Sequence, residues 1–162
     1  MKATIVYYSR GGRTKEMAQL IADGMNSVEG VEARIFSIDA IDADYLAASD
    51  VFLVGTPVYY ASTTWQIKKW FDESRNVVLA GKLGGAFATA DYAQGGAANA
   101  ITTILTHMMV KGMLVYSGGG AYGKPIIHQG PVALKDTLEA DREMFPVYGK
   151  RIAEKAIELF GK

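Results

Sequence analysis

Polar and cationic side chains surround a glycine pair in the stretch SRGGRT, residues 9–14, directly after the apolar run ATIVYY. A segment with helical spacing follows at once, so the loop would lie at a helix N-terminus, where free N–H groups and the helix dipole favour an anion. The glycines would let the backbone curl around that anion, while hydroxyl and guanidinium groups could donate hydrogen bonds to it. The residues concerned are Ser9, Arg10, Gly11, Gly12, Arg13 and Thr14.

The same residues of this loop are compatible with a tight turn, and they can also be compared with a P-loop. A tight turn with Thr14 as an ordinary N-cap would explain the same residues, and both arginines could point into solvent. A P-loop is excluded, because that motif has a lysine followed by Ser or Thr after its last glycine, and this chain has GGRTK. An anion site here would therefore suit a monophosphate rather than a nucleoside triphosphate.

Two further loops carry side chains that could hold a flat ligand. GTPVYYASTTW contains the adjacent tyrosines Tyr59 and Tyr60, which could stack on a ring system, although core packing or a subunit contact would explain them equally well. ATADYAQGG supplies Thr89, Asp91, Tyr92, Gly95 and Gly96. Backbone amides in such a turn could bind the edge of a heterocycle, but a plain connection between a strand and a helix is the alternative.

The elements that would position these loops alternate between short apolar runs and longer amphipathic ones, which indicates βα units and a parallel sheet. Strands are expected at 3–9, 32–38, 50–57, 83–90 and 112–118, and helices at 14–27, 42–49, 63–73, 97–110 and 137–160, with a kink or late start of the last at Pro146. This pattern predicts an open, doubly wound α/β sheet. Ligands of such sheets bind beyond the carboxyl ends of the strands, where the three loops would meet. Together they predict a site for a phosphorylated planar ligand.

Composition narrows the classes of protein further. The chain has 162 residues, which suits one domain, 1–162, and its 17 basic residues balance 17 acidic ones. That balance argues against a nucleic-acid or anionic-membrane partner. Cysteine is absent, which excludes disulfides and thiolate metal sites, and the two histidines lie on different segments, so no metal site is predicted. With no signal-peptide pattern and no apolar run of membrane-spanning length, we expect a cytoplasmic protein.

The stretch GGGAYGK, residues 118–124, imitates two nucleotide-binding motifs. It lacks the Ser or Thr of a P-loop, and Pro125 and Pro131 prevent the helix that a dinucleotide-binding motif requires. We expect a surface loop that covers the ligand or joins a subunit contact. A serine hydrolase is disfavoured as well, because the chain has no G-x-S-x-G elbow.

All three ligand loops resemble those of flavodoxin-like proteins. IVYYSRGGRTKEMAQLIADG resembles the opening of that family, where a strand feeds a phosphate loop for FMN. GTPVYYASTTWQIKKWFDE and GGAFATADYAQGGAANAITTIL are similar to the second and third loops of the flavodoxin-like quinone reductases named for tryptophan-repressor-binding protein A. The resemblance implies a single flavodoxin-like domain with a five-stranded parallel sheet, order 2-1-3-4-5, helices on both faces, and FMN as cofactor.

The resemblance also implies a role for each loop. Ser9, Arg10, Gly11, Gly12, Arg13 and Thr14 would hold the FMN phosphate, and Pro57, Val58, Tyr59 and Tyr60 would lie along the isoalloxazine ring. Thr89, Ala90, Asp91, Tyr92, Gly95 and Gly96 would contact its pyrimidine edge or the ribityl chain. The chain departs from flavodoxins in having GGRT for their usual Thr-Gly-Asn-Thr. It has Val110 and Lys111 about where the quinone reductases carry a histidine near the flavin, so no catalytic residue is predicted.

Two functions follow from this resemblance. In the first, NAD(P)H passes hydride to flavin N5, and a quinone or similar small-molecule acceptor is then reduced. In the second, the protein is a flavodoxin-type single-electron carrier between redox protein partners. Such carriers are typically strongly acidic, and the neutral balance of this chain favours the reductase. A neutral surface and a tyrosine-bearing mouth also permit a homodimer.

Overall fold

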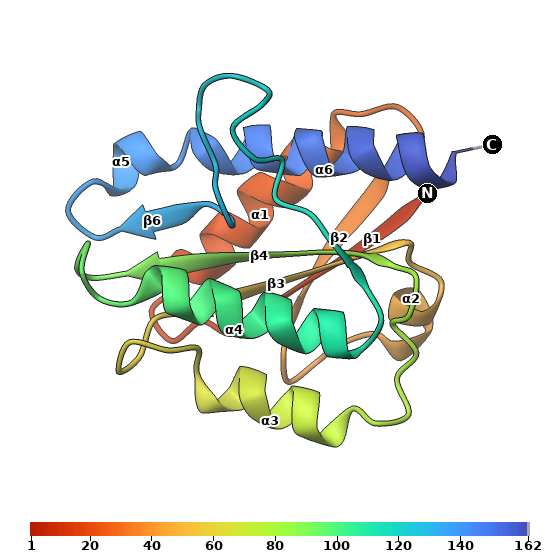
Figure 1. Cartoon of the computed structure of the whole chain (residues 1–162), viewed down its shortest axis with the longest axis horizontal. Helices are drawn as coiled ribbons and strands as arrows, with labels where there is room; N and C mark the ends of the chain where they lie inside the picture. The colour runs from red at the N-terminus through yellow and green to blue at the C-terminus, as the bar shows by residue number, and fades with distance from the viewer. Residues whose placement is uncertain (162) are drawn as a thin grey trace.

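A twisted parallel sheet lies between two layers of helices in the computed structural model, which describes residues 1–161 (Figure 1). The strands are β1 (Lys2–Tyr7), β2 (Glu32–Ser37), β3 (Val51–Pro57), β4 (Leu83–Ala90), β5 (Leu114–Val115) and β6 (Val132–Leu134). The helices are α1 (Arg13–Asn26), α2 (Ala43–Ala47), α3 (Trp65–Glu73), α4 (Ala97–Val110), α5 (Leu138–Asp141) and α6 (Met144–Phe160). No helix in this described range has the length and apolar character that a membrane crossing requires.

Strand order is β2-β1-β3-β4-β5, which confirms the predicted doubly wound topology. In this order Ile5 of β1 pairs with Ile35 on one side and Leu53 on the other. The central strands β3 and β4 are buried on both faces, and this explains why their sequences are near-continuous apolar runs without alternation. The carboxyl ends of β1, β3 and β4 therefore lie side by side at one edge of the sheet.

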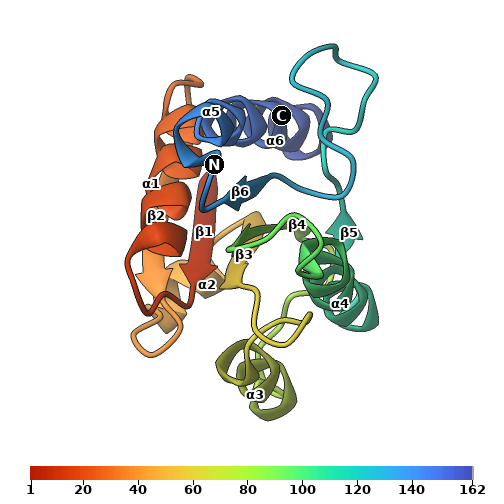
Figure 2. The same ribbon diagram turned by 90° about the vertical axis from the view of Figure 1, so that its left-hand side faces the viewer.

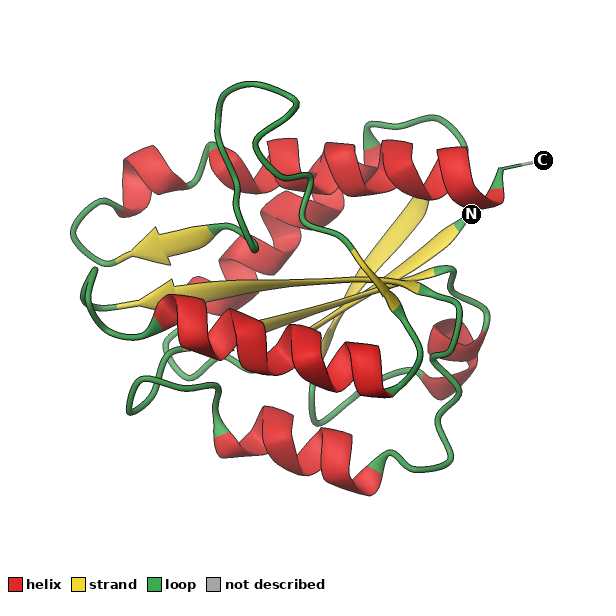
Figure 3. Ribbon diagram, in the orientation of Figure 1, coloured by secondary structure: helices red, strands yellow, loops and turns green. Residues whose placement is uncertain are grey.

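Helices α1 and α6 cover one face of the sheet, and α3 and α4 cover the other (Figures 1 and 3). The core under α1 and α6 contains Phe87, Phe145 and Tyr148, all fully buried. On the other face the half-buried ring of Trp70 packs against Phe52 and Phe71. Each face thus has its own apolar core, and the sheet is held rigidly between them.

The fifth strand differs from the prediction of a strand over 112–118. Only Leu114 and Val115 pair with β4, and Gly118 and Gly119 then turn the chain away with φ of 78° and 54°. The chain returns as β6, which was not predicted and which pairs with the carboxyl end of β4 through Val132. Glycine adopts these left-handed conformations without the steric cost of a side chain, which explains why the edge strand is interrupted at this point.

The predicted last helix is also divided, because α5 is a separate short helix and α6 begins only at Met144. Pro146 lies in the first turn of α6, where its missing N–H costs no helical hydrogen bond, so the late start predicted from the sequence is confirmed.

The loop 116–131 crosses α6 and extends beyond it before the chain returns to β6 (Figure 1). The Arg151 guanidinium of α6 donates to the carbonyls of Pro125 at 2.9 Å and of Tyr122 at 3.2 Å. None of the loop residues lines the pocket at the carboxyl edge of the sheet. Arg151 thus holds the loop against α6, and a role of the loop over the ligand or in a subunit contact stays a prediction.

Candidate functional site

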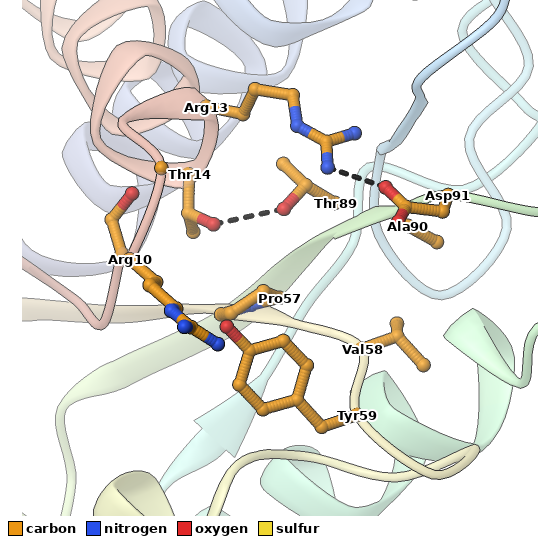
Figure 4. A pocket seen from close by; sticks show the side chains of 11 residues that line it. Arg10, Arg13, Thr14, Pro57, Val58, Tyr59, Thr89, Ala90 and Asp91 are labelled. Carbon is orange, nitrogen blue, oxygen red and sulfur yellow. Dashed lines mark hydrogen bonds and ion pairs between the residues drawn. The ribbon is translucent and has the colours of Figure 1, made fainter.

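A pocket of about 130 Å³ opens at the carboxyl edge of the sheet, where the loops after β1, β3 and β4 meet. Figure 2 looks onto this edge, and Figure 4 shows the side chains of the pocket. It is lined by Ser9, Arg10, Gly11, Arg13, Thr14, Pro57, Val58, Tyr59, Thr89, Ala90 and Asp91. All of these belong to the set predicted from the sequence, so the structure brings most of that set together around a single hollow.

The first loop forms a backbone cradle at the start of α1. The Gly12 N–H donates to the Ser9 hydroxyl at 3.1 Å, and Gly12 adopts φ of 92°. The first helical hydrogen bond runs from the Glu16 N–H to the Gly12 carbonyl, 2.9 Å, so the amides of residues 13–15 have no partner within the helix and can donate to a ligand. A side chain added at Gly11 would meet no atom within 4 Å. The cradle is thus open and rich in donors, as an anion site requires.

The two arginines of this loop point in different directions (Figure 4). Arg13 reaches across the pocket and forms an ion pair with Asp91 of the third loop, and its guanidinium lowers the pKa of that carboxyl below the ordinary value. Arg10 extends toward Tyr59 and forms no ion pair within the described residues 1–161. Arg10 is therefore the cation of the cradle whose charge is not already balanced.

A pair of buried hydroxyls forms part of the pocket wall. Thr14 and Thr89 lie 2.8 Å apart between their Oγ1 atoms, and both residues are almost fully buried. One hydroxyl donates to the other, which leaves the second hydrogen free for a ligand. The pair joins α1 to the end of β4, so the first and third loops are linked at the side chains as well as through the sheet.

The second loop is a tight hairpin built on Thr56. The Thr56 hydroxyl accepts from the Thr64 N–H at 3.2 Å, and Tyr59 and Ser62 exchange two backbone hydrogen bonds of 3.1 Å. Between them Tyr60 and Ala61 have φ of 49° and 59°. This is the conformation of a type I′ turn, which Asn and Gly adopt far more readily than Tyr and Ala. The turn is strained, and it holds Tyr60 fully exposed at its tip.

We expect the variant Ala61→Gly to be more stable than the wild type by about 0.5–1 kcal/mol, because glycine removes the steric cost of the left-handed conformation. Chemical unfolding followed by circular dichroism measures this difference. The control is Ala98→Gly, at an exposed position of α4, where the same change should lower stability by about 1 kcal/mol. A loss of stability in both variants would contradict the strain at the hairpin.

Some predicted residues lie outside the pocket wall, namely Gly12, Tyr60, Tyr92, Gly95 and Gly96. Gly96 has φ of 92° and packs so closely on the second loop that an added Cβ would lie 2.6 Å from Ala61. Its glycine identity is thus explained by the contact between two loops. Asn99 was not predicted, and its side-chain amide donates to the Ala61 carbonyl at 2.8 Å. A lone asparagine in the first turn of a helix gave no signal of this contact.

Larger hollows exist elsewhere but lack convergent polar groups. Two of them, about 540 and 560 Å³, flank Ile126 and Met144 between the loop 116–131 and α6. Both have mostly apolar walls. A candidate site is better judged by its chemistry than by its volume, and unlike these two hollows the pocket at the sheet edge combines a cation, free amides and hydroxyls.

His107 packs edge-on against Phe71, and burial lowers its pKa. Residues 1–161 contain no group of three or more His, Cys, Asp or Glu side chains that could hold a metal ion.

Comparison with known proteins identifies the family. Residues 43–123 match the model of the NADPH-dependent FMN reductase family. The chain is 45% identical to a flavodoxin of Clostridium saccharobutylicum over 99% of its own length and 100% of the relative. The chain belongs to the flavodoxin-like FMN-binding family. Within this family it is also 26% identical to an NAD(P)H dehydrogenase (quinone) of Chromohalobacter salexigens, with 99% of both chains covered.

Solved structures of the flavodoxin-like family agree with this placement. A flavodoxin, WrbA-like protein from Agrobacterium tumefaciens superposes with a TM-score of 0.82 at 26% identity, over 98% of both chains. A flavodoxin from the domain Archaea gives 0.78 at 28% identity, over 96% of this chain and 99% of the other. The predicted flavodoxin-like fold is thereby confirmed, and so is the predicted cofactor class.

The residues of the pocket fit an FMN phosphate. The open glycine cradle, the free amides at the start of α1 and the unpaired Arg10 supply donors and positive charge without a clash. The one carboxylate of the pocket wall, Asp91, is already neutralised by Arg13. The second and third loops complete the wall of the same hollow through Pro57, Val58, Tyr59 and Ala90.

Proposed function

We propose that this flavodoxin-family protein is an FMN-dependent oxidoreductase that takes hydride from NAD(P)H and reduces a quinone or similar small acceptor. The observation that carries the proposal is the charge balance of 17 basic and 17 acidic residues. A carrier that docks on protein partners gains speed from a strongly charged surface, whereas small substrates need only an accessible flavin face. The match to a family of NADPH-dependent FMN reductases supports the same activity.

In this proposal the bound FMN supplies the redox chemistry, exchanging hydride at N5. The chain's own residues bind and orient the cofactor. The amides after Gly12, together with Arg10 and Thr14, hold the phosphate, and Pro57, Val58 and Tyr59 line one side of the ring. The backbone after Thr89 contacts its polar edge. No side chain is assigned to proton transfer, because no histidine lines the pocket within residues 1–161 and its one carboxylate, Asp91, is paired with Arg13.

A single-electron carrier is the second candidate function. The 45% identity to a flavodoxin over the full length of both chains favours it, and the relatives named NAD(P)H dehydrogenase (quinone) are less similar. The exposed Tyr60 and Tyr92 of the second and third loops could then meet a protein partner or a second copy of this chain. A homodimer stays a prediction.

The purified protein is expected to be yellow and to release FMN on denaturation. We expect anaerobic NADH or NADPH to bleach its absorption within seconds, and an added quinone to restore it in a stoichiometric amount. The measurement is stopped-flow absorbance at the flavin band. Bleaching by dithionite in two separate one-electron steps, with no response to either nicotinamide, would reject the reductase in favour of the carrier. A protein that binds no added FMN would reject both.

A further inference from the structure

The third loop, residues 91–96, has few attachments to the rest of the molecule. Within it, the Gly95 N–H donates to the Tyr92 carbonyl at 3.0 Å. Among the described residues, its one side-chain bond to another element is that of Asp91 to Arg13. Its far end, at Gly96, packs on Ala61. The position of the loop therefore depends on one ion pair and one backbone contact.

The ion pair lies beside a second link between the same two segments. Thr14 follows Arg13 at the start of α1, and its hydroxyl meets Thr89, two residues before Asp91. The inner link is buried, and the outer link is half-exposed. Arg13 Nη2 is the atom bound to Asp91 in this arrangement. A guanidinium committed to a carboxylate is a weaker phosphate ligand than one with no ion pair, such as that of Arg10.

We propose that Arg13 and Asp91 form a latch that positions the third loop, and with it Tyr92, over the flavin, while Arg10 supplies the charge for the phosphate. Arg13 and Asp91 are then positioning residues. This inference rests on the proposed function only in naming the flavin as ligand. It reassigns Arg13 from the role that the sequence resemblance implied, because the ion pair commits its Nη2 atom to Asp91 rather than to a phosphate.

The latch predicts a particular pattern of ligand affinities. Arg13→Ala and Asp91→Ala should each lower the affinity for FMN and the affinity for riboflavin by the same factor. We expect this factor to be roughly fivefold, which is the upper range for a half-exposed ion pair. The double variant should be no weaker than either single one, because both changes remove the same bond. Asp91→Glu should recover most of the affinity. Fluorescence titration of apoprotein with each flavin gives the dissociation constants. Arg10→Ala should lower the affinity for FMN and leave that for riboflavin unchanged.

Hydrogen exchange tests the latch without any ligand. The Gly95 amide, which donates to the Tyr92 carbonyl, should exchange several-fold faster in Asp91→Ala than in the wild type, while the amides of β4 stay unchanged. The matched control is Asp72→Ala, which removes the exposed ion pair with Lys68 on α3 and should leave exchange in the third loop unaltered.

Three results would overturn the latch. One is unchanged exchange of the Gly95 amide in Asp91→Ala, which decides the matter even if the protein binds no flavin and the proposed function fails. Another is an Arg13→Ala variant that loses affinity for FMN but keeps it for riboflavin, since Arg13 would then be a phosphate ligand. The third is tighter FMN binding by Asp91→Ala, because Asp91 would then compete with the phosphate for Arg13.

Discussion

Replacing Gly149 with alanine is expected to lower the free energy of unfolding by about 2–3 kcal/mol. A Cβ at this position in α6 would lie 2.2 Å from the Ile21 carbonyl oxygen of α1. At the same crossing, a Cβ at Gly24 of α1 would lie 2.1 Å from the Pro146 carbonyl oxygen. Both obstacles are backbone atoms of helices, which cannot move aside as a side chain would. The two helices would have to separate, and the buried surface of Phe145 and Tyr148 would loosen.

The expected loss of stability has the opposite sign to the effect of helix propensity, so the test distinguishes the two. In an ordinary helix, glycine to alanine is stabilising by about 1 kcal/mol, so helix propensity alone predicts the opposite outcome. Thermal unfolding followed by circular dichroism should show a loss of about 2–4 °C for each kcal/mol in a chain of this size. Gly120→Ala is the control, because its Cβ would meet only Ile126 at an ordinary 3.5 Å. An equally stable Gly149→Ala would mean that α1 and α6 do not approach this closely.

The close approach of α1 and α6 shows what a sequence can and cannot predict here. The strands β3 and β4 and the helix α4 follow from the sequence, because their burial gives uninterrupted apolar runs or a clear helical period. A glycine inside a helix gives no such signal. Gly149 reads as a weak point of the helix, and only the packed structure shows that it permits a contact.

The prediction of the edge strands was wrong for a different reason. Val132–Leu134 is too short to show a period, and it becomes a strand only because Ala88 and Ala90 of β4 offer it free hydrogen-bonding groups. The expected strand over 112–118 ends early because of Gly118. The pairing of β6 joins Val132 to Ala88, which are too far apart in the chain for a local pattern to resolve.

For the site, the sequence predicted which loops meet, because the carboxyl ends of parallel strands share one edge. It did not predict which side chains of those loops face one another. Arg10 and Arg13 are equivalent in the sequence, yet only Arg13 reaches Asp91, 78 residues away. Gly96 was expected to contact a ligand, and in the structure it contacts Ala61. Topology thus follows from the pattern of residues, while pairing between loops does not.

Placing a carboxylate in the cradle, with Gly11→Asp, should weaken FMN binding by about 2–3 kcal/mol, roughly 50-fold. Two unit charges 4 Å apart near a protein surface repel by about 4 kcal/mol, and salt and exposure reduce this value. The substitution itself should be tolerated, because nothing lies within 4 Å of the added Cβ. The effect would therefore report on the ligand's charge rather than on damage to the fold.

Gly11→Asn is the matched control, since it adds the same shape without the charge. We expect it to lower the affinity for FMN far less than Gly11→Asp does, and we expect both variants to bind riboflavin equally well. Raising the salt concentration should narrow the gap between the two variants for FMN, because screening acts on exposed charges. Fluorescence titration with both flavins at low and high salt measures all of this. If the aspartate and asparagine variants bind FMN alike, the phosphate does not lie at Gly11, and the first loop is a turn whose glycines only shape the start of α1.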